Sequence, residues 1–261
     1  MLDGGTLIGA VRHQGFIPWD DDIDITMPLA DYYRFCDVCR TELSDEYFLQ
    51  TILTDNFSHF WAKVRKNGTV MLEKDCPDNI HQGIWIDIFP IIGMESSPEF
   101  LQKTKTRMIN YKNFILECRS PAPFHRMAFE NGFLRHVPKK LQHLMWKKQF
   151  RLIMKKLLLC MPESLLYTVQ KDLLRKLFKP ADTSDMCCTV CGDDMGIYAR
   201  FPSVLFRDSV ELEFEGHRFP APAGYDAFLT IVYGDYMTPP PESERNAGST
   251  HTVTYVDWCD S

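Results

Sequence analysis

The chain has 261 residues, of which 45% are hydrophobic and 25% are charged, and its formal net charge at pH 7 is −6. A chain of this length can bury a sizeable core, either as one large domain or as one domain with an inserted helical part. No apolar run approaches the roughly 18–20 residues that a membrane-spanning helix requires. The acidic balance and the lack of a recognisable DNA- or RNA-binding motif weigh against nucleic acid as a partner.

The nine cysteines are odd in number and follow no regular disulfide spacing. Reduced thiols are therefore the favoured interpretation, and the expected location is the cytoplasm. Cys187, Cys188 and Cys191 are followed by Gly192, and C-x-x-C loops of this kind are used by zinc sites. No second pair of ligands follows nearby, so zinc binding and ordinary core packing both stay open.

The first predicted element is a tight turn that opens a short helix. Gly4 and Gly5 are followed by Thr6, and the apolar residues after them recur at helical spacing as far as Arg12. A helix start offers free backbone N–H groups and the positive end of the helix dipole, and phosphates bind at such ends. The pattern therefore indicates a phosphate cradle at the two glycines and Thr6, with Arg12 as a further candidate for phosphate or nucleotide binding.

An acidic run follows at residues 18–25, with carboxylates at Asp20, Asp21, Asp22 and Asp24. Read as a strand, the alternation of aspartate and isoleucine sends Asp22 and Asp24 to one face. Two carboxylates on one face repel each other unless a cation lies between them, and oxygen ligands suit Mg²⁺ or Mn²⁺. The run predicts a metal site with Asp22 and Asp24 as ligands and Asp20 as an outer partner. An exposed acidic turn is the alternative.

The runs DGGTLIGAVRH (Asp3–His13) and GFIPWDDDIDI (Gly15–Ile25) together resemble the signature of the LicD family, which includes bacterial phosphocholine transferases and animal fukutin-type sugar-phosphate transferases. The resemblance implies a nucleotidyltransferase-like fold, in which the Gly-Gly turn and the Asp-x-Asp strand build a Mg²⁺ site. It also implies transfer of a phospho-alcohol from a CDP-activated donor to a hydroxyl of a glycan. Because such a fold places a strand before the turn, we expect further chain ahead of Met1.

Two basic side chains come next, Lys63 and Arg65. They precede the turn signal of residues 66–69, so residues 62–64 and 69–72 are predicted to form a β-hairpin. The family resemblance makes Lys63 and Arg65 candidate phosphate contacts near the donor nucleotide. A solvated hairpin edge that carries ordinary basic residues is the alternative.

Asp87 is the second acidic candidate. It lies among apolar residues at positions 84–89, which describe a strand buried on both faces, and an unpaired carboxylate there would be costly. The cost falls if Asp87 faces the same cation as Asp22 and Asp24, and a carboxylate in that place could also act as general base toward the attacking hydroxyl. The resemblance supports a catalytic Asp87, and a satisfied structural aspartate is the alternative.

The middle of the chain has a helical pattern. One amphipathic helix is predicted from residue 97 towards residue 117, and residues 135–179 carry 12 Lys or Arg against 2 acidic residues. A basic amphipathic helix of this kind can lie on the anionic inner face of a membrane. It can equally pack its apolar side on the core with the lysines in water, and both interpretations stay open.

Short strands return in the C-terminal part. Residues 210–214 and 216–220 are predicted to form a hairpin with its turn at Glu215-Gly216, followed by a helix at residues 227–232. The segment Tyr233-Gly234-Asp235-Tyr236 and the proline-rich run after it also resemble LicD-family sequence.

These elements predict an α+β fold with a nucleotidyltransferase-like mixed β-sheet core, flanking helices and a helical insertion. The expected parts are a catalytic core at residues 1–96, a mostly helical basic insertion at 97–199, and C-terminal strands with a proline-rich tail at 200–261 that complete the core. The predicted function is Mg²⁺- or Mn²⁺-dependent transfer of phosphocholine, or of a similar phospho-alcohol, to a hydroxyl of a cell-surface glycan such as lipopolysaccharide, teichoic acid or capsule.

The expected partners are CDP-choline or another CDP-alcohol, such as CDP-ribitol or CDP-glycerol, and a glycan or lipid-linked glycan acceptor. A peripheral contact with the inner membrane surface is a further expectation, and nucleic acid is not expected to bind. Two alternatives stay open, namely a nucleotidyltransferase that moves NMP from an NTP, and a non-catalytic member of the same fold.

Overall fold

The computed structural model describes residues 1–55, 59–73, 80–94, 160–190, 200–245 and 253–258, together with isolated positions between 97 and 109. Helices and a mixed β-sheet make up this part of the chain, so the predicted α+β class is confirmed. Most of the predicted helix at residues 97–117, the basic stretch at 135–159 and the third cysteine of the zinc hypothesis, Cys191, lie outside the described residues.

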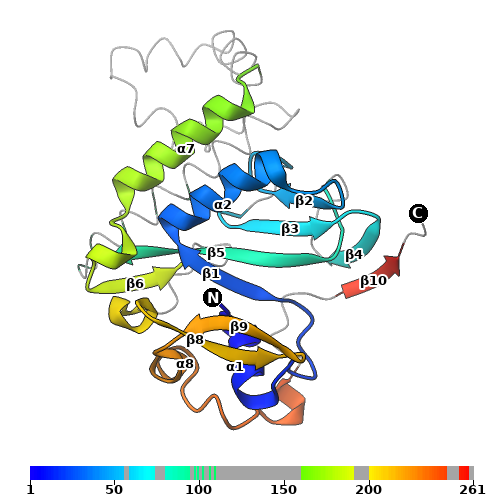
Figure 1. Cartoon of the computed structure of the whole chain (residues 1–261), viewed down its shortest axis with the longest axis vertical. Coiled ribbons are helices and arrows are strands. Elements are labelled where there is room, and N and C mark those ends of the chain that lie inside the picture. Colours follow the sequence, from blue (N-terminus) through cyan, green and yellow to red (C-terminus); the bar gives the residue numbers. More distant parts are fainter. Residues whose placement is uncertain are drawn as a thin grey trace.

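A six-stranded sheet forms the centre of the molecule (Figure 1). Its strands are β1 (Asp24–Pro28), β2 (Tyr47–Gln50), β3 (Ala62–Lys66), β5 (Trp85–Met94), β6 (Met186–Thr189) and β7 (Phe201–Pro202). Strand β5 is shared by three neighbours, because β1 pairs with it in parallel, whereas β3 and β6 pair with it in antiparallel orientation. The register aligns Asp24 and Lys63 with Asp87, so three charged side chains lie in one row across the sheet.

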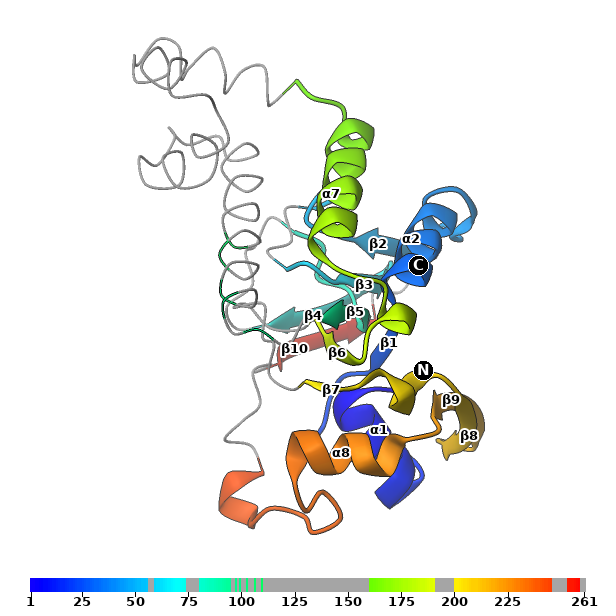
Figure 2. The same cartoon turned by 90° about the vertical axis from the view of Figure 1, so that its left-hand side faces the viewer.

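Strand β4 (Thr69–Glu73) corrects the predicted hairpin. The turn is present, with Gly68 at φ 70°, but β4 pairs with β10 (Val253–Trp258), as Figure 2 shows, and not with β3. Both edges of β3 are already occupied, one by β2 and the other by β5. A strand inside a sheet has no remaining edge to offer, so the chain after the turn pairs elsewhere.

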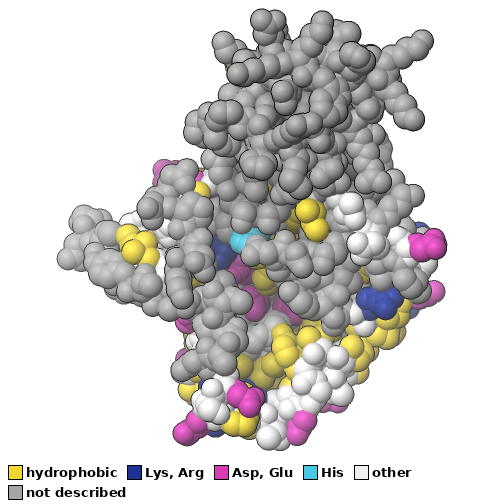
Figure 3. Space-filling model, turned by 180° about the vertical axis from the view of Figure 1, so that it is seen from behind, with side chains coloured by type: hydrophobic (Ala, Val, Ile, Leu, Met, Phe, Trp, Pro, Cys, Tyr) yellow, Lys and Arg dark blue, Asp and Glu magenta, His cyan; other side chains and the backbone are white. Residues whose placement is uncertain are grey.

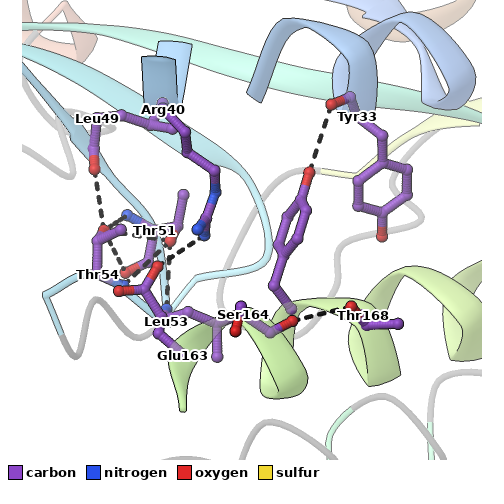
Figure 4. Close-up of polar contacts among 10 residues, drawn as sticks. Tyr33, Arg40, Leu49, Thr51, Leu53, Thr54, Glu163, Ser164 and Thr168 are labelled. Atoms are coloured by element: carbon purple, nitrogen blue, oxygen red, sulfur yellow. Dashed lines mark hydrogen bonds and ion pairs between the residues drawn. The ribbon is translucent and has the colours of Figure 1, made fainter. Parts of the chain in front are cut away.

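Helices α2 (Leu29–Glu42) and α7 (Glu163–Leu177) lie side by side over one face of the sheet (Figure 1). Ile88 and Ile92 of β5 are buried in the same hydrophobic cluster as Tyr33 of α2. The two helices also contact each other through polar groups (Figure 4): the Tyr167 hydroxyl donates to the Tyr33 carbonyl at 3.3 Å, and an ion pair of 2.7 Å joins Arg40 to Glu163.

A second layer lies below the sheet in Figure 1 and contains α1 (Gly4–His13), β8 (Ser209–Phe214), β9 (His217–Pro222) and α8 (Tyr225–Tyr233). These elements share a hydrophobic cluster that includes Leu7, Phe214 and Phe228. The hairpin β8–β9 and the helix after it confirm the prediction for this region. Its turn residues Glu215 and Gly216 both have positive φ, at 51° and 74°, as two-residue hairpin turns of type I′ require.

Three short 3₁₀ helices complete the described elements, namely η3 (Ala181–Thr183), η4 (Ser203–Phe206) and η5 (Glu242–Glu244). Strand β6 falls in the stretch that was predicted as a helical insertion, yet it pairs with β5 in the central sheet. The three-part division of the chain stays a prediction. Within the described part of the chain, no helix combines the length and the apolar character that crossing a bilayer requires. Membrane contact through the basic stretch stays a prediction as well.

Candidate metal and phosphate site

Three carboxylates meet where β1 begins beside β5. Asp24 is the first residue of β1 and is aligned with Asp87, whereas Asp22 lies in the loop just before the strand, so the strand starts later than the aspartate–isoleucine alternation predicts. One carboxylate oxygen from each of Asp22, Asp24 and Asp87 lies within 4.8 Å of the other two. The predicted convergence of these side chains is therefore present.

The cluster lies on the sheet face that α2 and α7 do not cover. Side chains alternate along a strand, and Ile88 packs with α2, so its neighbour Asp87 points to the opposite face. Figure 3 views the molecule from that side and shows acidic side chains gathered in a hollow at the middle of the face, next to a histidine and a basic side chain. On this face Asp22 and Asp24 are half-buried, and Asp87 is buried.

Electrostatic repulsion makes this cluster a candidate cation site. Burial raises the pKa of Asp24 well above its usual range, and the neighbouring carboxylates of Asp22 and Asp87 raise it further. A second acidic group, Asp20, Asp21 and Asp22, also has one oxygen from each residue within 4.8 Å of the others. Mg²⁺ binds oxygens at about 2.0–2.1 Å, which places ligand oxygens roughly 3–4 Å apart, so either group could hold one such ion after a small closure.

The start of helix α1 lies directly against these carboxylates. Asp3 caps the helix by accepting a hydrogen bond of 2.8 Å from the Gly4 N–H, and Gly4 has φ +53°. A Cβ atom at Gly4 would lie 2.6 Å from Asp24 Oδ2, and one at Gly5 would lie 2.3 Å from Asp20 Oδ2. The two glycines therefore allow the acidic side chains to approach the helix start, and the predicted phosphate cradle and metal site are adjacent.

Thr6 and Arg12 have different surroundings along the same helix. The Thr6 hydroxyl is buried and accepts a hydrogen bond of 2.8 Å from the backbone N–H of Asp24, so Thr6 helps to fix this carboxylate residue. Arg12 lies roughly 12 Å further along the helix axis than Gly4. Its guanidinium donates to the Tyr236 carbonyl at 2.5 Å, and partial burial lowers its pKa. The structure thus places Arg12 away from the acidic cluster and against the C-terminal segment.

Lys63 and Arg65 are both buried, which makes the solvated-edge alternative wrong. The Lys63 ammonium lies 3.4 Å from Asp87 Oδ2, at the acidic cluster. Arg65 is fully buried, and its guanidinium donates to Gln50 Oε1 at 2.6 Å and to the Gly83 carbonyl at 2.7 Å. The structure brings Lys63 to the candidate site, while Arg65 is engaged by protein groups; a phosphate contact for either stays a prediction.

Two tryptophans complete the surroundings of Asp87. Trp61 donates its indole N–H to Asp87 Oδ1 at 2.5 Å, and Trp85 donates to Oδ2 at 2.8 Å. From the sequence they were only aromatic residues that could cage a choline cation, with nothing to choose between them, and a contact with Asp87 was not predicted. A signal was available for Trp85, because residues two apart in a strand share a face, whereas Trp61 reaches Asp87 only through strand pairing.

Comparison with known proteins agrees with this geometry. Residues 1–139 match the family described as LicD/FKTN/FKRP, nucleotidyltransferase domain. The lipopolysaccharide cholinephosphotransferase LicD of Haemophilus influenzae is 30% identical over 246 residues, which are 94% of this chain and 84% of that protein. The ribitol 5-phosphate transferase FKRP of Homo sapiens and that of Mus musculus are each 24% identical over 137 residues, which are 52% of this chain and 24% of those proteins. A domain match over more than half of the chain, together with a nearly full-length relative, shows that the chain belongs to the LicD/FKTN/FKRP family.

Proposed function

We propose that this protein transfers a phospho-alcohol from a CDP-activated donor to a hydroxyl group of a cell-surface glycan. Two family members support the class of group transferred, because one is named a cholinephosphotransferase and the other a ribitol 5-phosphate transferase. The observation that carries the proposal is the meeting of Asp22, Asp24 and Asp87 beside the glycine start of α1. Phosphocholine is the first candidate group, since a relative that matches 94% of this chain is named a lipopolysaccharide cholinephosphotransferase.

The donor set favours a hard divalent cation. Asp22, Asp24 and Asp87 would hold Mg²⁺ or Mn²⁺, with Asp20 as an outer partner, because carboxylate oxygens suit these ions and the spacing fits. When bound, such an ion supplies positive charge for the phosphates of the donor and for the leaving CMP.

The chain's own groups then position the donor. The backbone N–H groups of Gly5 and Thr6 belong to the first turn of α1, where the helix supplies no internal acceptor. A phosphate oxygen is a suitable acceptor there, and the helix dipole favours its negative charge. Lys63, next to Asp87, is a further candidate for contact with a donor phosphate.

The proposed reaction is a single displacement at the phosphorus that carries the alcohol. The acceptor hydroxyl oxygen forms a bond to this phosphorus, and the bond from the phosphorus to the oxygen that bridges to CMP breaks. CMP leaves with the electron pair, and the hydroxyl proton is released to solvent. Asp87 fits the role of ligand, because each oxygen that accepts an indole hydrogen bond keeps a second lone pair for a cation, and the role of general base toward the acceptor hydroxyl stays an alternative.

The test uses CDP-choline labelled with ³H in cytidine and ¹⁴C in choline. We expect Mg²⁺-dependent release of ³H-CMP, with ¹⁴C-phosphocholine transferred to lipopolysaccharide or to water. Asp22→Asn should lower this rate by about 100-fold or more, as loss of charge stabilisation does in other enzymes. Asp172→Asn is the matched control, because Asp172 is exposed on α7, over the opposite face of the sheet.

Three outcomes would contradict the proposal. Cytidine label on the product would show nucleotidyl transfer instead. Full activity of Asp22→Asn would show that the metal assignment is wrong. No turnover of CDP-choline, CDP-ribitol or CDP-glycerol by a folded protein with Mg²⁺ or Mn²⁺ would favour a non-catalytic member of the family.

A further inference from the structure

The carboxylate of Asp87 is held between two indole rings. Trp61, which precedes β3, donates to Oδ1, and Trp85, two residues earlier on β5, donates to Oδ2. Because each donor engages a different oxygen, rotation of the carboxylate about its Cβ–Cγ bond would break at least one of the two hydrogen bonds. The arrangement therefore fixes the plane of the carboxylate as well as its position.

The chemistry of these donors suits a metal ligand. An indole N–H is neutral and can only donate, so it orients a carboxylate without cancelling the negative charge that attracts a cation. Among the described residues, Lys63 forms an ion pair with Asp87 at 3.4 Å. Its ammonium also lies 4.0 Å from the centre of the Trp85 ring. Groups that orient ligands from behind in this way tune metal sites in many proteins.

Other side chains of the protein pack against the indole rings of both tryptophans. Trp61 is 7% exposed, and its ring stacks on His59 at 4.0 Å between centroids and lies 5.3 Å from Phe89. Trp85 is 4% exposed, with Lys63 and Arg65 over its ring at 4.0 and 4.9 Å. An aromatic cage for a quaternary ammonium needs ring faces that the ligand can reach. These two rings offer little such surface.

We propose that Trp61 and Trp85 are positioning residues that orient Asp87 for the divalent ion, and that they are not a choline cage. This inference rests on the proposed metal site. It implies that any preference for choline over ribitol or glycerol is set by residues other than these two tryptophans.

The test measures Mn²⁺ affinity without donor or turnover. Free Mn²⁺ is titrated by electron paramagnetic resonance against the whole chain and against Trp61→Phe and Trp85→Phe, which keep an aromatic ring and remove the N–H. We expect the Mn²⁺ dissociation constant to rise about 10- to 100-fold in each variant, as it does when groups behind a metal ligand are removed. Trp19→Phe is the matched control, because the Trp19 ring contacts Arg245 and no hydrogen bond joins it to Asp87 among the described contacts. Its Mn²⁺ affinity should be unchanged.

Steady-state kinetics distinguishes the two roles of the rings. If Trp61→Phe and Trp85→Phe keep the wild-type Mn²⁺ affinity but raise KM for CDP-choline and not for CDP-ribitol, the rings form a cage and the inference is overturned. If the wild-type chain itself binds no Mn²⁺, the proposed metal site fails and this inference falls with it. Thermal unfolding identifies a variant that does not fold, and the other indole variant then decides the outcome.

Discussion

Substitution of Gly5 by alanine is expected to damage the site while leaving the fold intact. The added Cβ would lie 2.3 Å from Asp20 Oδ2, and real Cβ atoms essentially never approach another heavy atom within 3.0 Å. The carboxylate must therefore move by at least about 0.7 Å, the difference between the two distances. It can do so cheaply, because the atom in the way is the end of a flexible side chain. The Asp20 carboxylate would thus be displaced from its place beside Asp21 and Asp22.

Opposite effects on stability and activity follow from this geometry. Alanine is favoured over glycine inside a helix by up to about 1 kcal/mol, so the free energy of unfolding should be unchanged or slightly higher. A displacement approaching 1 Å at a catalytic group costs as much as about 100-fold in rate. We therefore expect kcat/KM for CDP-choline to fall between about 10- and 100-fold, with Asp20 acting as an outer partner of the ion.

The matched control is Gly216→Ala. Gly216 lies at the β8–β9 turn with φ +74°, and a Cβ there meets nothing within 4 Å. Alanine should destabilise this turn by about 1 kcal/mol through backbone strain while activity stays at the wild-type level. Urea unfolding and CMP-release kinetics on both variants test the pair. Wild-type kcat/KM in Gly5→Ala would refute the reasoning, as would a loss of activity that merely follows a loss of stability.

Three further expectations concern the fold. Replacing Arg65 by methionine leaves two buried acceptors without their donor and should lower the free energy of unfolding by roughly 2–6 kcal/mol in urea titrations; lost activity at unchanged stability would instead indicate a phosphate contact. Iodoacetamide at pH 8 followed by peptide mass mapping should label the exposed Cys160 before Cys36 and Cys187, because burial raises the pKa of Cys36 to about 12 and that of Cys187 to about 11. Their early alkylation in the folded chain would contradict this. Glu163→Gln should cost less than about 1 kcal/mol in thermal unfolding, since the ion pair to α2 is partly exposed; a loss of several kcal/mol would show that this contact holds α7 in place.

Local sequence pattern was sufficient to predict the elements that build the acidic cluster. The glycine pair predicts the start of α1, and the apolar residues around Asp87 predict β5. The acidic run and the isolated aspartate were each unfavourable without a shared cation, and this common cost predicted that Asp22, Asp24 and Asp87 converge. The electrostatic argument therefore predicted a contact between segments more than 60 residues apart in the sequence.

The contacts that sequence did not reveal all depend on which strand lies next to which. The hairpin prediction for β4 failed because β2 and β5 already pair with the two edges of β3. The turn signal at Gly68 does not reveal which strands lie beside β3. For the same reason the sequence did not show that Arg65 is buried and bonded to Gln50, and left it as either a phosphate contact or a solvated edge residue. The hydrogen bond from Trp61 to Asp87 likewise exists only because β3 pairs with β5. Periodicity tells which face a side chain occupies, and strand neighbours are set by the packing of the whole sheet.

The most direct measurement is anomalous diffraction at the manganese edge from crystals of the chain grown with Mn²⁺. The account predicts one strong peak bonded to one oxygen from each of Asp22, Asp24 and Asp87, at about 2.0–2.3 Å, with the indole N–H groups of Trp61 and Trp85 still donating to Asp87. A peak bound by the loop carboxylates alone, with the side chain of the third aspartate turned away, would contradict it.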